Sequence, residues 1–239
     1  MTAPIDTQFG AKNDYFEDFK VTAIGDLPEV DVQSATGVTT AILADQLGGV
    51  VEIPVAATDD DDVAAVSTNL NYQIEAGGLY GEARVKVDTS IADMKFFIGF
   101  ADNIASADET TFSATTDTVT IDTVSDGIGW LFDNDATTKN FWAVAGAADA
   151  VTVGVSVANR HDFSGVGVWK TFGVYASPDG KAAEWYIDGE KVYSTESASA
   201  LVTVTDPLCF GVWNYEQGTA YELEVDYLYV RNGRDQADN

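Results

Sequence analysis

Three carboxylates alternate along one stretch near the C-terminus, in the order Glu222, Glu224 and Asp226. Alternate residues of a β-strand lie on the same side of a sheet, so these acids are expected on one face. Two carboxyl groups about 5–5.5 Å apart are the machinery of retaining glycoside hydrolysis. The stretch is therefore a candidate for glycan cleavage, although we favour the alternative interpretation, a solvent-facing or interface strand.

Other catalytic chemistry finds little support in the residue types. His161 is the only histidine and Cys209 the only cysteine, so any Ser-His-Asp, Cys-His or zinc site must use one of them. His161 lies in a loop-like stretch, and Cys209 stands between Leu208 and Phe210, as expected of a core thiol. We predict no catalytic residue, no cofactor and a protein that is not an enzyme.

Two acidic loops are candidate calcium ligands. Asp59 to Asp62 are four adjacent carboxylates, and Asp133-Asn134-Asp135 supply three oxygen-bearing side chains in a row. Consecutive loop residues point in different directions, whereas calcium needs oxygen ligands that converge. We predict a solvated loop and an ordinary Asx turn, respectively, with calcium as the alternative at both.

Length and composition indicate one acidic globular domain. The chain has 239 residues, of which 46% are hydrophobic, and a formal net charge of −27. That charge repels nucleic acid and anionic membranes. It indicates solubility or adaptation to salt, or else a cationic or calcium-rich partner. Neither a secretory signal nor an apolar run long enough to span a bilayer is evident.

The clearest structural signal is the stretch 169–193, in which two turn sequences separate alternating runs. Ser177-Pro178-Asp179-Gly180 and Asp188-Gly189 predict two consecutive hairpins. Leu79 to Asp88 predicts a strand with one wet face. Further strands are expected near 38–44, 51–55, 94–100, 127–132, 140–145, 208–213 and 221–230. Residues 22–37 are expected to be mostly loop, Pro54 to mark an edge strand or its end, and 101–126 to be a long loop with one short strand at 118–121.

Several stretches together resemble concanavalin A-like lectin/glucanase jelly rolls. They are FEDF at 16–19, GEARVKV at 81–87, FIGFAD at 97–102, WYIDG at 185–189 and VDYLYV at 225–230. The resemblance covers residues 14–231, and 84–144 is similar to the version found in uncharacterised virion proteins of tailed bacteriophages. It implies two facing antiparallel sheets, one of them concave.

The resemblance also suggests which residues would cleave or bind glycans. Glycosidases of this fold carry a pattern close to Glu-x-Asp-x-Glu, from which residues 222–226 depart in order and in lacking a neighbouring Trp. Lectins of this fold bind sugars through loops with an Asp, an Asn and an aromatic residue, often beside calcium. Asp133, Asn134, Asp135 and Trp142 fit that description and are the predicted glycan-binding candidates. Most of the five tryptophans are expected in the core.

The function predicted from these observations is a non-enzymatic virion protein, a decoration protein on the outer surface of a tailed-phage capsid. It would be synthesised in the host cytoplasm and bind the major capsid protein as a homo-oligomer, for which a trimer is the expected form. The alternative is a carbohydrate-binding module that binds surface glycans, and a glycan hydrolase is a distant third.

Three segments are expected along the chain. Residues 1–13 form a flexible arm, 14–231 the jelly-roll domain and 232–239 a polar tail. In the arm, Ile5 and Phe9 are apolar residues in polar surroundings and are the candidate capsid-docking residues.

Overall fold

The computed structural model describes residues 13–21, 23, 26–27, 30–43, 49–57, 63–87, 94–102, 111–138, 140–157 and 167–232. Within these ranges the chain is built of strands, with the short 3-10 turn η2 (Ile74–Ala76) and no helix that could cross a membrane. The strands are β1 (Asn13–Glu17), β2 (Val30–Gln33), β3 (Ala41–Ile42), β4 (Val51–Val55), β5 (Val63–Thr68), β6 (Leu79–Val87), β7 (Lys95–Ala101), β8 (Phe112–Thr115), β9 (Thr118–Ile121), β10 (Gly127–Asp133), β11 (Phe141–Ala147), β12 (Ala150–Val157), β13 (Trp169–Ala176), β14 (Ala182–Ile187), β15 (Glu190–Glu196), β16 (Cys209–Tyr215) and β17 (Tyr221–Asn232).

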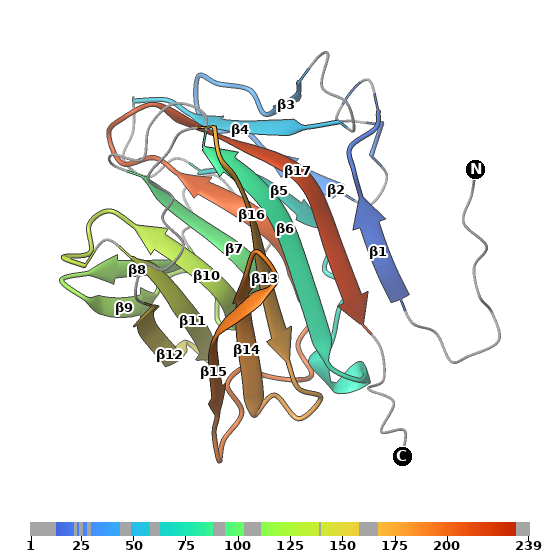
Figure 1. Ribbon diagram of the computed structural model, residues 1–239, viewed down its shortest axis with the longest axis vertical. Coiled ribbons are helices and arrows are strands. Elements are labelled where there is room, and N and C mark those ends of the chain that lie inside the picture. The colour runs from blue at the N-terminus through green and yellow to red at the C-terminus, as the bar shows by residue number, and fades with distance from the viewer. Residues whose placement is uncertain are drawn as a thin grey trace.

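Two antiparallel sheets pack face to face (Figure 1). The first sheet has the strand order β15-β14-β13-β6-β17-β4-β3, and β1 pairs with the C-terminal half of β17. The second sheet has the order β12-β11-β10-β7-β16-β5-β2. A separate hairpin, β8–β9, lies against the second sheet beside β10 and β12. The predicted all-β, two-sheet jelly-roll sandwich is confirmed.

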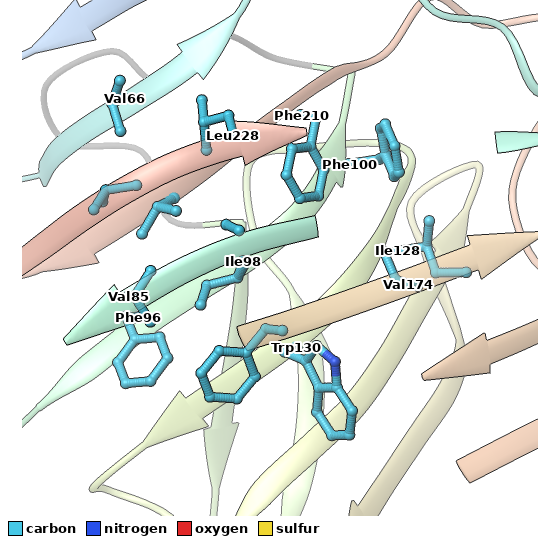
Figure 2. Packing of buried hydrophobic residues seen from close by; sticks show 14 of the residues in the cluster. Val66, Val85, Phe96, Ile98, Phe100, Ile128, Trp130, Val174, Phe210 and Leu228 are labelled. Atoms are coloured by element: carbon cyan, nitrogen blue, oxygen red, sulfur yellow. The ribbon is translucent and has the colours of Figure 1, made fainter. Parts of the chain in front are cut away.

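The core lies between the sheets and takes side chains from both. In β6, every second residue from Leu79 to Val87 is buried and the intervening ones are partly exposed, as period-two alternation requires. Figure 2 shows Val85, Val174 and Leu228 of the first sheet among residues of the second. Burying each large apolar side chain contributes about 1.5–3 kcal/mol, which makes this layer the main source of stability.

Two buried tryptophans bond the sheets to each other in a reciprocal manner. Trp130 of β10 donates its indole N–H to the carbonyl oxygen of Gly173 in β13, at 3.0 Å. Trp185 of β14 donates to the carbonyl oxygen of Gly129 in β10, at 2.7 Å. Both rings are fully buried, so each N–H needs a partner inside the protein. These bonds hold β10 at one position opposite β13 and β14.

The outer face of the second sheet is covered in part by the β8–β9 hairpin, which forms a second apolar cluster with it. Phe112 of the hairpin packs against Phe97 of β7, with ring centroids 5.4 Å apart. Polar bonds also connect hairpin and sheet: Thr111 and Tyr215 join through their hydroxyls at 2.7 Å, and Asp117 accepts from the backbone of Thr138. This face is therefore largely buried.

The strongest sequence predictions are confirmed. Trp169 to Tyr193 form the two consecutive hairpins β13–β14 and β14–β15. Asp188 and Gly189 both have positive φ, 52° and 77°, which explains why an Asx-Gly pair stands at that turn. Cys209 is a buried thiol, and four of the five tryptophans are buried, with Trp169 partly exposed.

Three local predictions hold only in part. Residues 22–37 are mostly loop as expected but contain strand β2, whose short length conceals it. The strand predicted at 118–121 is confirmed as β9, but it pairs with a strand that was not predicted, β8. Pro54 lies one residue before the end of β4, close to the predicted strand end. β4 is not an edge strand, because it lies between β17 and β3, but β3 pairs only with Val51 and Glu52 and leaves Pro54 without a partner on that side.

β1 begins at Asn13 and β17 ends at Asn232, and the predicted limits of the jelly-roll segment, 14 and 231, stay predictions. The candidate docking residues Ile5 and Phe9 lie outside the described residues. The arm and the polar tail therefore remain predictions.

The indole bond of Trp130 gives the first testable prediction. Trp130→Phe keeps most of the ring but removes the donor to Gly173, and we expect a loss of about 1–3 kcal/mol in the free energy of unfolding, measured by urea denaturation. Trp169→Phe is the matched control, with an expected change below about 1 kcal/mol because that ring is partly exposed. Equal effects of the two substitutions would contradict the role assigned to the inter-sheet bond.

Candidate functional site

The outer face of the first sheet carries a group of partly exposed aromatic side chains around one carboxylate. We call it the tyrosine face and define it by Phe16, Tyr80, Glu82, Tyr175, Tyr186, Tyr227 and Tyr229. These residues come from β1, β6, β13, β14 and β17, and their neighbours in each strand point into the core. The same alternation that buries the core therefore presents the tyrosines outward.

One cross-strand row forms the centre of this face. Strand register places Tyr186, Gly173, Glu82, Tyr229 and Phe16 directly opposite one another across β14, β13, β6, β17 and β1. Neighbouring strands lie about 4.8 Å apart, so the row crosses the sheet as a band about 19 Å long. Because each residue stands on a strand, the band is held by backbone hydrogen bonds rather than by loops.

The rings of the tyrosine face contact each other. Tyr80 meets Tyr186 and Tyr229, each with ring centroids 6.1 Å apart and in edge-to-face orientation. At the end of the row, Phe16 lies 5.5 Å from the ring of Tyr227. Phe16 is the most exposed large apolar side chain in the described chain, at 59%.

Gly173 makes room for this arrangement. A Cβ atom at this position would lie 2.8 Å from the Tyr80 hydroxyl oxygen, closer than real Cβ contacts occur. The missing side chain lets Tyr80 lie over β13, where its ring fills the space between Tyr186 and Glu82. A glycine within a strand often marks such a close approach.

Glu82 is fixed by two tyrosine hydroxyls. Tyr80 donates to Oε2 and Tyr227 donates to Oε1, each at 2.6 Å. A carboxylate oxygen has more than one acceptor position, so each oxygen can take a further donor from solvent or from a ligand. Glu82 is thus an oriented acceptor with open capacity at the centre of the face.

The described cations near the face are bound to other carboxylates. Arg84 pairs with Asp226 at 2.6 Å and lies 4.9 Å above the Trp169 ring, and Lys86 pairs with Glu224 at 2.7 Å. Lys191 pairs with Glu184 at 2.8 Å, and Arg231 lies 3.9 Å from Asp14. Among the described ion pairs none involves Glu82.

Burial and the neighbouring carboxylates keep the hydroxyls of the face protonated. Burial raises the pKa of both Tyr80 and Tyr227, and the bond to Glu82 raises it further. Burial, and then Glu184, raise the pKa of Tyr186 to about 12. Burial also raises the pKa of Tyr229. The hydroxyls therefore act as donors throughout the physiological range.

The three alternating carboxylates of β17 do not form a catalytic pair in the expected manner. A bulge between Val225 and Tyr227 interrupts the ladder with β6, so Asp226 is the extra residue. Glu224 is buried against Lys86, and Asp226 holds Arg84. The bulge also brings Tyr227 and Tyr229 onto the face of Glu82, a consequence that alternation alone does not reveal.

The predicted glycan-binding residues lie at the second sheet instead. Asp133 is buried at the end of β10, and Asn134 and Asp135 form the turn after it. Trp142 is 97% buried in the cluster beneath the hairpin, and its Nε1 has no partner among the described residues. Asp133 and Trp142 are thus buried, whereas Asn134 and Asp135 are more exposed. A role of these four residues in glycan binding stays a prediction.

Asp133 stabilises both the turn that follows β10 and the β8–β9 hairpin. It accepts hydrogen bonds from the backbone N–H groups of Asp135, at 3.0 Å, and Ala114, at 2.8 Å, and it lies 3.9 Å from Lys95 Nζ. No group of three or more acidic, His or Cys side chains that could hold a metal occurs in the described part of the chain. The other calcium candidate, Asp59 to Asp62, and His161 lie outside it.

Comparisons with known proteins place this fold. No family model and no curated protein sequence matches the chain. A protein of unknown function from Shewanella oneidensis MR-1 has a TM-score of 0.59 and 16% identity, and the match covers 96% of this chain and 91% of that protein. The β-glucanase of Bacillus licheniformis has a TM-score of 0.57 and 14% identity, and the match covers 92% of this chain and 98% of the glucanase. A carbohydrate esterase from the Shiga toxin-encoding bacteriophage phi24B has a TM-score of 0.53 and 14% identity, and the match covers 86% of this chain and 90% of the esterase.

The chain has the concanavalin A-like jelly-roll fold. At identities this low the likeness shows the fold, as the sequence motifs indicated. The prediction that the protein is not an enzyme is contradicted, because similar structures include glucanases, a glycosidic hydrolase and a carbohydrate esterase. That prediction depended on a missing sequence pattern, and absence of a pattern does not exclude catalysis on this jelly roll.

The raised tyrosine pKa values predict a pH dependence of stability. Unfolded tyrosines lose their protons near pH 10, whereas the folded chain retains them, so above that pH the folded state binds more protons. The free energy of unfolding should be unaffected by these groups below about pH 10 and should fall as the pH rises further. Urea denaturation from about pH 8 to 11.5 measures this.

Tyr80→Phe combined with Tyr227→Phe provides the comparison, since it removes two of the titrating hydroxyls. The double variant should lose stability less steeply above about pH 10 than the parent chain. A parent stability that stays level or rises across this range would contradict the assignment.

Proposed function

We propose that this protein binds glycans and that the tyrosine face is the binding site. The observation that carries the proposal is the row across five strands, in which partly exposed aromatic rings surround Glu82, a carboxylate oriented by two tyrosine hydroxyls. The function corresponds to the carbohydrate-binding alternative from the sequence. The site is a different one.

Glycans match this surface chemically. A sugar ring has an apolar face of C–H groups and a rim of hydroxyls, so it requires a flat apolar surface beside a few placed acceptors and donors. Tyrosine rings supply apolar area with a polar tip, and only two χ angles are fixed when a tyrosine is ordered. Glu82 supplies acceptors for the hydroxyls, and its fixed orientation reduces the entropy lost on binding.

Several of the comparisons support a glycan as the ligand class. Three of the similar structures are named as glucanases or a glycosidic hydrolase, and the phage protein is named as a carbohydrate esterase. Their names concern those proteins, and their likeness to this chain concerns the fold. We therefore propose a glycan as the ligand class. Release of reducing ends measures whether the bound glycan is also cleaved.

A place on the surface of a tailed-phage virion, with the major capsid protein as partner and a homotrimeric assembly, stays a prediction. The bacteriophage protein among the similar structures is what supports the phage context. Co-sedimentation with purified particles and labelling by a membrane-impermeant reagent test it; recovery of the protein only from the soluble lysate would contradict it.

Glycan-array binding followed by calorimetric titration tests the proposed function. The wild-type chain should bind at least one glycan, and Tyr80→Ala should weaken that binding by about tenfold, because it removes the ring that contacts both Tyr186 and Tyr229 and one partner of Glu82. Incubation of the same glycan with the wild-type chain, followed by assay of released reducing ends, reports any hydrolysis.

Asp135→Ala is the matched control for this experiment. Asp135 is exposed and belongs to the loop at the second sheet that the sequence predicted for sugar binding. We expect its affinity to equal that of the wild type. Loss of binding in Asp135→Ala with retention in Tyr80→Ala would move the site to that loop, and absence of binding to every glycan would remove the proposed function.

A further inference from the structure

The tyrosine face has a direction and a length that specify its ligand further. The row from Tyr186 to Phe16 runs across the strands and is about 19 Å long, by the spacing of β-strands. A sugar unit in an extended chain advances by roughly one strand spacing, about 5 Å. The row therefore has room for about four consecutive units and has an aromatic side chain at each end.

The two ends of the row are aromatic but differ in their surroundings. Tyr186 is held by its hydroxyl, which donates to Glu184, and by its edge-to-face contact with Tyr80. Phe16 has no hydroxyl and exposes most of its ring beside Tyr227. Both present apolar surface at a point where a terminal sugar ring would lie, whereas Glu82 stands between them.

The charges on this face select against anionic sugars. The cations nearest the row are held by carboxylates, as in Arg84 with Asp226 and Lys86 with Glu224. Within the part of the chain that the structure describes, Glu82 has hydroxyl partners only and no unpaired cation beside it, so an approaching carboxylate or sulfate would meet its negative charge. The net charge of −27 acts in the same direction.

On the basis of the proposed function, we infer that the ligand is an uncharged, extended oligosaccharide of about four units that lies across the strands from Tyr186 to Phe16. Its ring faces contact the terminal aromatic side chains, and its central hydroxyls donate to Glu82. Such a site recognises about four consecutive units of a neutral polysaccharide.

A length series tests this inference. Cello-oligosaccharides of one to six glucose units serve as neutral probes, and tetragalacturonate serves as an anionic probe of matched length, all in calorimetric titrations with the full chain. Affinity should rise with each unit up to four and then level off, and tetragalacturonate should bind at least about tenfold more weakly than cellotetraose.

Two end variants locate the chain on the row. Phe16→Ala and Tyr186→Ala should each weaken binding of the tetrasaccharide by about three- to tenfold while leaving the affinity for the disaccharide within about twofold. Their circular dichroism and melting temperature should match the wild type, because neither side chain belongs to the buried core.

The outcomes separate this inference from the proposed function. If array glycans bind and Tyr80→Ala weakens them, but affinity is independent of length or the acidic tetrasaccharide binds as tightly as the neutral one, the inference is overturned and the proposed function stands. If no glycan binds, or if Tyr80→Ala has no effect on those that do, both are overturned.

Discussion

The hydrogen bond from Trp130 to the carbonyl oxygen of Gly173 connects the core to the proposed site. On its inner side, Gly173 receives the indole N–H of the opposite sheet at 3.0 Å. On its outer side, its missing side chain accommodates the Tyr80 hydroxyl. The position of β13 therefore determines both how the sheets pack and how the tyrosine face is arranged. A sandwich core is close-packed, so displacement of β13 in the core would move the rings outside it.

Charge distribution is the second constraint on this molecule. Only twelve residues of the chain are basic, and four of them, Arg84, Lys86, Lys191 and Arg231, form ion pairs on the outer side of the first sheet. Three of these pairs are at least partly exposed and contribute little to stability, about 0–1 kcal/mol each, whereas Glu224 is buried against Lys86. Their effect here is local, because they neutralise the surroundings of the tyrosine face in a strongly acidic protein. An uncharged ligand with many hydroxyls suits such a surface better than a charged one.

Much of the fold could be predicted from the sequence, because its signals are local. The Asp188-Gly189 turn and the alternation from Leu79 to Val87 determine hairpin and strand without reference to the rest of the chain. Strands β2 and β8 were not predicted, although β9 was. Pairing with the distant strand β5 stabilises β2, and apolar contact with the second sheet stabilises the β8–β9 hairpin. Local propensity carries no record of such contacts.

The candidate site could not be predicted in the same way, because it depends on register. Tyr80 and Glu82 were expected on a wet face, but nothing local brings Tyr186 and Phe16 into one row with Glu82. The β-bulge at Val225–Tyr227 further changes which residues of β17 share that face. The predicted loop at Asp133 matched a general lectin pattern, yet Asp133 is engaged by backbone N–H groups and Trp142 is buried under the hairpin.

The most direct measurement of the central claim is NMR observation of the aromatic side chains during titration with a glycan that binds. Binding at the tyrosine face should shift or broaden the ring resonances of Tyr80, Tyr186, Tyr229 and Phe16, and leave the indole N–H of Trp142 and the backbone amide of Asp135 unchanged. Changes confined to Trp142 and Asp135, with the four rings of the first sheet unaffected, would contradict the claim.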